Sequence, residues 1–394
     1  MVYRVLLGWE FGGGNGHIVH LREIASRIAI DQPCEFLFVL QNPAGGRSAG
    51  LPNNCVISVP APGRRVNGNR PQGRETYGEF VAENLMLEEG DFAFRLAGWD
   101  KIIRHFKPHL IIADYAPSLS LCARGRWPVL VIGNGYTMPP PEQESFPPVA
   151  ARNRPQYATD AEIIGRLNKD LAMMGAKTIE RLPQLNEADA YGLLTIPLFD
   201  PYRATRQQLY LGVEIPGGSP LPKASGSGGI GYFHQESQMN DDLLDGLLDA
   251  NIETAVNFGP LMRRVSKKFK GSRVRPVSSP FKLVDDMAGK AVAIHHGGLG
   301  FATAAVLAGV PQVLLFRHDE HQFTANAIVR AGAGLATDYR IIYPGAIAAA
   351  MEHVAASSAM RERALQLAEE NAAFRGANPV QAAADIALKF LRAN

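Results

Sequence analysis

The sequence has 394 residues, of which 46% are hydrophobic and 20% charged, and its formal net charge is +2. This length is typical of two domains, and the small net charge argues against nucleic acid as a partner and allows at most peripheral membrane contact. Three cysteines without the spacing of a zinc site indicate a reducing compartment. The N-terminus lacks the features of a signal peptide, and no 18-residue apolar run is without a charge, so we expect a cytoplasmic protein.

Short apolar runs alternate with helical patterns in the first half of the chain, as they do in a parallel α/β sheet. The predicted strands are 5–7, 35–40, 56–59, 110–113 and 129–132, and the predicted helical regions are 17–30 and 75–107. The proline-rich segment 138–155 is predicted to be a loop.

Residues 215–229 are rich in glycine, proline and serine, and this composition predicts a linker. Beyond it the alternation restarts. The predicted strands there are 230–233, 254–258, 274–277, 291–294 and 313–316, and the predicted helices are 241–250, 300–307, 322–331, 345–356, 359–373 and 379–392. The expected fold class is therefore α/β, with two Rossmann-like, doubly wound domains facing each other across a cleft. Ligands of such sheets bind at the carboxyl ends of the strands.

A glycine-rich turn, Gly12-Gly13-Gly14-Asn15-Gly16, lies between the first strand and the first helix and is followed by His17. Glycines let backbone amides approach a ligand. A dinucleotide-binding turn has the same place, but here the turn ends in His17, and Asn42 in place of an acidic residue follows the second strand. The positive end of a helix dipole favours a neutral imidazole, which is the form that a general base requires. The alternative is that His17 only caps the helix.

Asp114 follows the predicted strand 110–113 and is expected at the ligand-binding edge of the same sheet. Its carboxylate can hold the imidazole of His17 in one tautomer and stabilise the imidazolium. Without His17, capping of the next turn would be the simpler explanation.

A second glycine-rich turn, His295-His296-Gly297-Gly298-Leu299-Gly300, joins a predicted strand to a predicted helix. Amides at a helix N-terminus bind anions, and His296 can add a donor. Gly298 and Gly300 keep side chains away from the place where a phosphate must approach. The turn therefore predicts a pyrophosphate site.

Together with Gly309-Val310-Pro311 and a polar pair nine residues beyond that proline, this turn resembles the donor site of the UDP-glycosyltransferase superfamily. Gly16-His17 is similar to the catalytic-histidine segment of the same superfamily. The resemblance implies the GT-B fold, inverting transfer without a metal or other cofactor, and a UDP- or dTDP-sugar as donor and co-substrate. It also implies an N-terminal acceptor domain (1–214), a C-terminal donor domain (230–376) and a last helix (377–394) that returns to the first domain.

Carried over to this sequence, the resemblance makes His17 the base and Asp114 its partner. The donor-binding residues that it implies are Gly16, His296, Gly297, Gly298, Gly300, Glu320, His321 and Gln322. The sequence departs from the superfamily's pattern at three of its positions. His321 replaces a Gln, so that Gln322 is an alternative for its role, Phe301 replaces a Ser or Thr (Thr303 lies further into the helix), and His20 replaces a proline. These departures concern the choice of sugar more than the reaction.

Aromatic and methionine side chains border the proline-rich loop and suit a flat or apolar acceptor, whose identity the sequence leaves open. The candidate acceptor-binding residues are Trp9, Tyr136, Met138 and Phe146, with Glu10 and Tyr157 nearby. Burial of these side chains within the loop itself is the alternative.

Seven lysines and arginines lie between Arg263 and Arg275. We expect a solvated surface there, and the alternative is a patch for an acidic acceptor or an anionic membrane. A metal site is a further alternative, although no single element contains a compact set of ligands. The histidines from which it could be drawn are His17, His20, His295, His296, His318 and His321.

Several functions remain open at the level of the sequence. The favoured one is sugar transfer to a hydroxyl or similar nucleophile of a small molecule, by a monomer or homodimer. An epimerase or hydrolase of sugar nucleotides would need no acceptor, and a catalytically silent homologue would only bind sugar nucleotides or activate a partner. The presence of both His17 and Asp114 argues against a silent homologue. A dehydrogenase is the least favoured alternative.

Overall fold

The computed structural model describes residues 2–12, 16–62, 76–86, 88–148, 158–233 and 240–393. Within these ranges the chain forms two compact units. Unit 1 comprises Met1–Thr195, Asp200–Leu211 and Asn378–Asn394, and unit 2 comprises Ile196–Phe199 and Gly212–Ala377.

Unit 1 is built on a parallel six-stranded sheet with the order β3-β2-β1-β4-β5-β6. Val5, Leu6 and Leu7 of the central strand are fully buried, as expected of a strand that is covered by helices on both faces. The strands are β1 (Tyr3–Trp9), β2 (Cys34–Leu40), β3 (Val56–Ser58), β4 (Leu110–Asp114), β5 (Val129–Gly133) and β6 (Ala190–Leu193). The helices are α1 (Gly16–Asp31), α2 (Pro43–Ser48), α3 (Tyr77–Leu85), α4 (Asp91–Phe106), α5 (Pro117–Ala123), α6 (Asp160–Met173) and α14 (Pro379–Ala393).

Unit 2 repeats this topology with the order β12-β11-β10-β7-β8-β9, so that in each unit the first strand pairs with the fourth. The strand order reverses at this pair, which opens a crevice at the carboxyl ends of the two strands. The strands are β7 (Gly229–Tyr232), β8 (Thr254–Asn257), β9 (Val274–Val277), β10 (Val292–His295), β11 (Gln312–Phe316) and β12 (Gly334–Asp338). The helices are α7 (Asp241–Asp249), α8 (Met262–Val265), α9 (Leu283–Asp286), α10 (Leu299–Leu307), α11 (Asp319–Arg330), α12 (Pro344–Ala356) and α13 (Ser358–Glu370).

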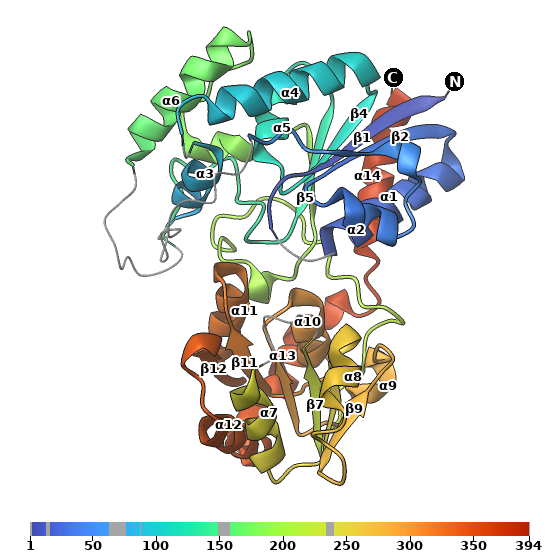
Figure 1. Cartoon of the computed structure of the whole chain (residues 1–394), viewed down its shortest axis with the longest axis vertical. Coiled ribbons are helices and arrows are strands. Elements are labelled where there is room, and N and C mark those ends of the chain that lie inside the picture. The colour runs from blue at the N-terminus through green and yellow to red at the C-terminus, as the bar shows by residue number, and fades with distance from the viewer. Residues whose placement is uncertain are drawn as a thin grey trace. The chain divides into compact units, whose positions relative to one another are not determined.

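The helix α14 lies beside α1 in unit 1, although the whole of unit 2 separates the two helices in sequence (Figure 1). Both helices bury an apolar stripe. The buried residues are Ile18, Leu21, Ile24, Ala25 and Ile28 on α1, and Val380, Ala383, Ala384, Ala387, Leu388 and Leu391 on α14. Packing of these stripes makes α14 part of the core of unit 1.

The elements differ from the sequence-based prediction in a few places. The helical region 75–107 is divided into α3 and α4, because Gly90 between them has a φ of 87°. The edge strands β6 and β12 were missed, as were α5 and α6. The segment 215–229, predicted as a linker, is part of unit 2, since Ile215 is buried in its core and Gly229 begins β7. None of the helices in the described ranges has both the length and the hydropathy to span a membrane.

Candidate functional site

The imidazole of His17 and the carboxylate of Asp114 meet at the carboxyl edge of the first sheet. His17 is the second residue of α1, and Asp114 ends β4, the strand paired with β1. Nδ1 of His17 lies 2.9 Å from Oδ2 of Asp114, and the two side chains are 14% and 2% exposed. Because a carboxylate only accepts hydrogen bonds, the contact assigns the proton of the neutral ring to Nδ1 and the lone pair to Nε2. The pair can therefore accept a proton at Nε2 and stabilise the imidazolium that forms.

Packing and backbone conformation hold the ring of His17 in place. The indole of Trp9 stacks on it, with 5.2 Å between the ring centroids and 20° between the planes. Gly12 has a φ of +93°, and a Cβ at this position would lie 2.9 Å from Nε2 of His17. Tyr115, next to Asp114, has a φ of +47°, a left-handed conformation that costs a non-glycine residue roughly 1–3 kcal/mol and is most frequent at functional sites.

His20 lies one turn further along α1, close enough to His17 and Asp114 for their charges to affect its pKa. Burial lowers the pKa of His20, the charge of Asp114 opposes this shift, and His17 adds to it. His20 is therefore neutral at pH 7.

An aromatic cluster adjoins His17. The ring of Tyr115 lies 6.1 Å from that of His17, and Phe80 stacks on Tyr115 at 5.4 Å. Tyr77 contacts Phe80 at 6.0 Å and Phe146 at 5.2 Å. Phe80 is half-buried, whereas the other rings are buried. Phe80 is therefore the ring of this cluster that is exposed enough to contact an acceptor, and the buried rings support it.

The four predicted acceptor-binding residues have different environments. Tyr136 and Phe146 belong to the aromatic cluster through their contacts with Tyr77. Trp9 is 2% exposed and contacts His17, and Met138 is fully buried. Tyr157 lies outside the described residues.

Glu10 supports the structure around the pair and is 2% exposed. Its carboxylate accepts hydrogen bonds from Nε1 of Trp99 at 2.7 Å and from the backbone N of Ser118 at 2.9 Å. The side chain of Glu10 therefore ties the end of β1 to α4 and α5, and these bonds account for its burial.

In unit 2, the second glycine-rich turn joins β10 to α10 at the carboxyl edge of the sheet. Gly297 has a φ of +97°, and a Cβ there would lie 3.0 Å from the backbone O of His321. Gly298 caps α10. The backbone amides in the first turn of this helix have no carbonyl of the helix as a hydrogen-bond partner. Such amides bind anions. The predicted Gly300 lies in this first turn, whereas Gly16 begins α1 in unit 1.

A chain of buried hydrogen bonds fixes the shape of this turn. His295 is fully buried, and its Nδ1 accepts from the backbone N of Gly297 at 3.1 Å while its Nε2 lies 2.9 Å from Oε1 of Gln312. Gln312 in turn donates to the backbone O of Ala302 at 3.4 Å. Burial lowers the pKa of His295 to about 4, against the opposing effect of Gln312. His295 is therefore a neutral, structural residue.

Phe301 occupies the place of the superfamily's Ser or Thr for a packing reason. Its ring stacks on Tyr232 at 5.5 Å and contacts His295 at 5.0 Å. Thr303 is fully buried one turn further along α10. Neither residue presents a hydroxyl at the start of the helix, so the backbone amides and His296 are the donors that the turn offers.

The three residues that the resemblance assigned to the sugar begin α11. Glu320, His321 and Gln322 are half-buried in its first turn. The ring of His321 lies 4.7 Å from that of His296 and 3.6 Å from that of His318, which precedes α11. The structure thus brings three histidines together beside the glycine-rich turn. In the parts of the chain that the structure describes, no group of three or more His, Cys, Asp or Glu side chains has a metal-binding arrangement.

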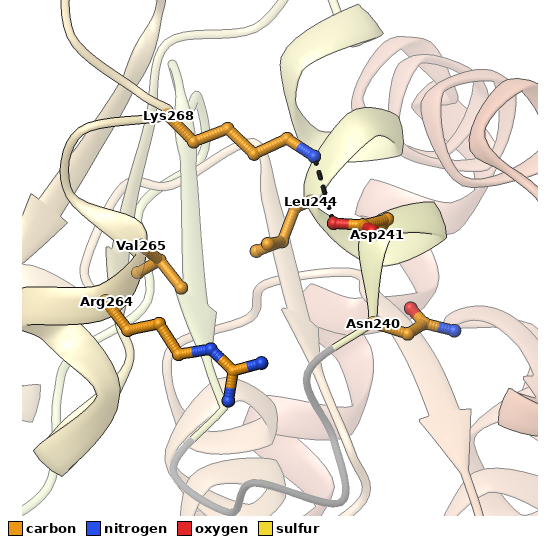
Figure 2. A pocket seen from close by; sticks show the side chains of 6 residues that line it. All are labelled: Asn240, Asp241, Leu244, Arg264, Val265 and Lys268. Carbon is orange, nitrogen blue, oxygen red and sulfur yellow. Dashed lines mark hydrogen bonds and ion pairs between the residues drawn. The ribbon is translucent and has the colours of Figure 1, made fainter.

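A cavity of about 220 Å³ lies between α7 and the segment that contains α8 (Figure 2). Asn240, Asp241 and Leu244 line it on the side of α7, and Arg264 and Lys268 on the other side. These two cations belong to the basic run 263–275. Lys268 pairs with Asp241 at 3.4 Å and with Asp245 at 2.7 Å, so this cation of the basic run is paired with α7 at the protein surface.

Comparisons with known proteins agree with this description. Residues 273–386 match the family described as Erythromycin biosynthesis protein CIII-like, C-terminal domain. O-mycaminosyltylonolide 6-deoxyallosyltransferase of Streptomyces fradiae is 39% identical over 87 residues, which make up 22% of this chain and 21% of that protein. The match thus spans about a fifth of that relative's length.

Solved structures resemble the chain over nearly its whole length. The calicheamicin glycosyltransferase CalG4 has a TM-score of 0.67 at 17% identity, with coverage of 99% of this chain and 98% of that one. The glycosyltransferase VinC, solved in complex with dTDP, has a TM-score of 0.62 at 16% identity, with the same coverage. The chain therefore has the fold of these glycosyltransferases, the GT-B fold. The family match over residues 273–386 includes the second glycine-rich turn and agrees with the resemblance that this turn predicted.

Proposed function

We propose that this chain is an inverting glycosyltransferase, which moves a sugar from a nucleoside diphosphate sugar to a hydroxyl group of a small-molecule acceptor. The observation that carries the proposal is the contact of 2.9 Å between His17 and Asp114 at the ligand-binding edge of the first sheet. The glycine-rich turn of unit 2 supplies the anion site that such a donor requires.

In the proposed reaction, Nε2 of His17 takes the proton of the acceptor hydroxyl while its oxygen attacks the anomeric carbon. The bond between that carbon and the diphosphate breaks, and the electron pair leaves with the diphosphate. One displacement of this kind inverts the configuration of the sugar. Asp114 stabilises the imidazolium, and the amides of the glycine-rich turn stabilise the charge that develops on the leaving group. No step requires a metal or another cofactor.

A dTDP-activated deoxy sugar is the donor that we favour over a UDP-sugar. VinC was solved with dTDP, and the name of the Streptomyces fradiae relative specifies a 6-deoxyallose. For the acceptor we favour a large, apolar aglycone, because the aromatic cluster that includes Phe80 and Tyr115 adjoins the base.

The first test is a calorimetric titration of the protein with dTDP, UDP and GDP. We expect micromolar binding of dTDP, and binding of none of the three would contradict the proposal. The second test is His17→Ala, which should abolish transfer to an acceptor while the Kd for dTDP stays within about twofold. Surviving transfer would refute the assignment of the base. Turnover of the donor in the absence of any acceptor would favour an epimerase or hydrolase.

A further inference from the structure

We propose that the donor diphosphate binds to unit 2 together with a proton, which His296 takes up so that its Nε2 can donate to a phosphate oxygen. This inference rests on the proposed function, because it concerns the donor site of the same reaction.

The hydrogen bond of His296 to the backbone identifies its tautomer. Nδ1 of His296 lies 3.3 Å from the backbone O of Tyr232. A carbonyl oxygen only accepts, so Nδ1 carries the hydrogen, and Nε2 of the neutral ring carries a lone pair. Nε2 is the ring atom nearest the turn, since a Cβ on Gly298 would lie 2.9 Å from it.

A neutral His296 is therefore poorly suited to a diphosphate. Both Nε2 and a phosphate oxygen are acceptors, and two lone pairs that face each other repel. The imidazolium carries hydrogen on both nitrogens, so that it can keep the bond to Tyr232 and donate a charge-assisted bond to the phosphate. His296 is 5% exposed, which leaves little water to take the place of that bond.

The neighbouring histidines strengthen the coupling between proton and ligand. His321 lies 4.7 Å from His296, and His318 lies 3.6 Å from His321, measured between ring centroids. Imidazoles this close repel one another when charged, so a charge on one ring opposes a charge on its neighbours. The negative charge of a bound diphosphate offsets this repulsion. A glutamine at position 321, which the superfamily usually has, would not titrate.

Charged groups on the adjoining segments moderate the effect. Although part of the His318 side chain is exposed, burial of the rest lowers the pKa of His318, while the charges of Glu320 and Asp319 raise it and that of Arg317 lowers it. The strand β12 adds Asp338, which pairs with Arg340. Positive and negative side chains are therefore both present around the three histidines. When the diphosphate binds, its negative charge shifts the net charge around His296 towards negative.

Linkage gives the direction and size of the effect. If binding takes up one proton, the affinity rises tenfold for each unit by which the pH falls, and uptake of half a proton gives about threefold. We expect the Kd for a dTDP-sugar to fall between about threefold and tenfold per pH unit from pH 8 to pH 6. The diphosphate of a dTDP-sugar is fully ionised over this range, so the proton is taken up by the protein.

The experiment is calorimetry of the wild-type protein with dTDP-glucose and with UDP-glucose at pH 6, 7 and 8. Each titration is repeated in two buffers with different heats of ionisation, which gives the number of protons taken up. We expect about half a proton or more at pH 7. His321→Gln should reduce this number, whereas the matched control His353→Gln, on an exposed position of α12, should leave it unchanged.

The outcomes separate the inference from the proposed function. If dTDP, dTDP-glucose and UDP-glucose all fail to bind, the donor class is wrong and the inference falls with it. If one of them binds without proton uptake and with a constant Kd, the inference alone is overturned. Nitrogen NMR of histidine-labelled wild-type protein adds a test without any variant. The signal of Nε2 of His296 should move to the imidazolium range when dTDP-glucose is added, and an unchanged signal would also refute the inference.

Discussion

Replacement of Asp114 by Asn removes one negative charge from the His17 pair with almost no change in side-chain volume. The 2.9 Å contact places the centres of charge of an imidazolium and the carboxylate about 4 Å apart. At an effective dielectric constant of about 20, their attraction is about 4 kcal/mol. Asp114 and His17 are both largely buried, so solvent screens this attraction little. In the proposed mechanism His17 becomes charged when it takes the acceptor's proton, so the loss applies to the transition state, and kcat should fall about 10³-fold.

The assay follows glycosylated acceptor by mass spectrometry under saturating donor, and calorimetry gives the Kd for dTDP. We expect kcat to fall and this Kd to stay within about twofold. Asp100→Asn is the matched control, since Asp100 lies on α4 and pairs with Arg104 at 2.6 Å and Arg126 at 3.1 Å. A folded Asp114→Asn protein that retains more than about a tenth of the wild-type kcat would refute the role of Asp114. An equal loss in the control would point to folding as the cause.

Three further predictions concern the turn and the cores. Gly297→Ala should weaken dTDP binding at least about tenfold, because a Cβ at a φ of +97° would lie 3.0 Å from the carbonyl of His321; unaltered affinity would show that the turn does not contact the diphosphate. Arg206→Met leaves the fully buried carboxylate of Asp200 without its cation and should lower the free energy of unfolding by about 3–5 kcal/mol, and a loss below about 1 kcal/mol in urea would contradict this. Burial lowers the pKa of His295 from 6.5 to about 4, so between these pH values the unfolded state binds more protons than the folded state. The contribution of His295 to the free energy of unfolding is therefore fully present above pH 6.5. It falls by up to about 1.4 kcal/mol per pH unit as the pH decreases below that value. His295→Gln should remove about one proton from this dependence, and urea unfolding curves with the same pH dependence for both proteins would refute the assignment.

The sequence predicted what depends on local chemistry. Each glycine-rich turn is contiguous, so the need for glycine and the helix that follows were both visible in one stretch. The pairing of His17 with Asp114 could also be inferred, because the carboxyl ends of parallel strands share one edge of a sheet. The edge strands β6 and β12 were missed, since small and polar residues interrupt their apolar pattern.

The aromatic cluster could not be predicted in the same way. Tyr77, Tyr115 and Phe146 come from different elements, and only the packing of α3 and the loop after β5 against the end of β4 brings their rings together. Tyr115 carried one local signal, its place directly after Asp114. Likewise, the sequence suggested His296 as a donor, but its tautomer depends on the carbonyl of Tyr232, which lies on another strand.

The return of α14 to unit 1 has a consequence for the order in which the chain folds as it leaves the ribosome. Most multidomain proteins complete their N-terminal domain first. Here α1 can pack on β1 and β2 early, but the part of its apolar stripe that contacts α14, and the faces of β4 and β6 that α14 covers, have no permanent cover until residues 379–393 have been synthesised, after all of Gly212–Ala377. Unit 2 is therefore the first that can reach its final core, while the nascent N-terminal part exposes an apolar surface that chaperones bind. A fragment that ends at Leu211 would keep this surface exposed, and we expect it to aggregate where the full chain does not.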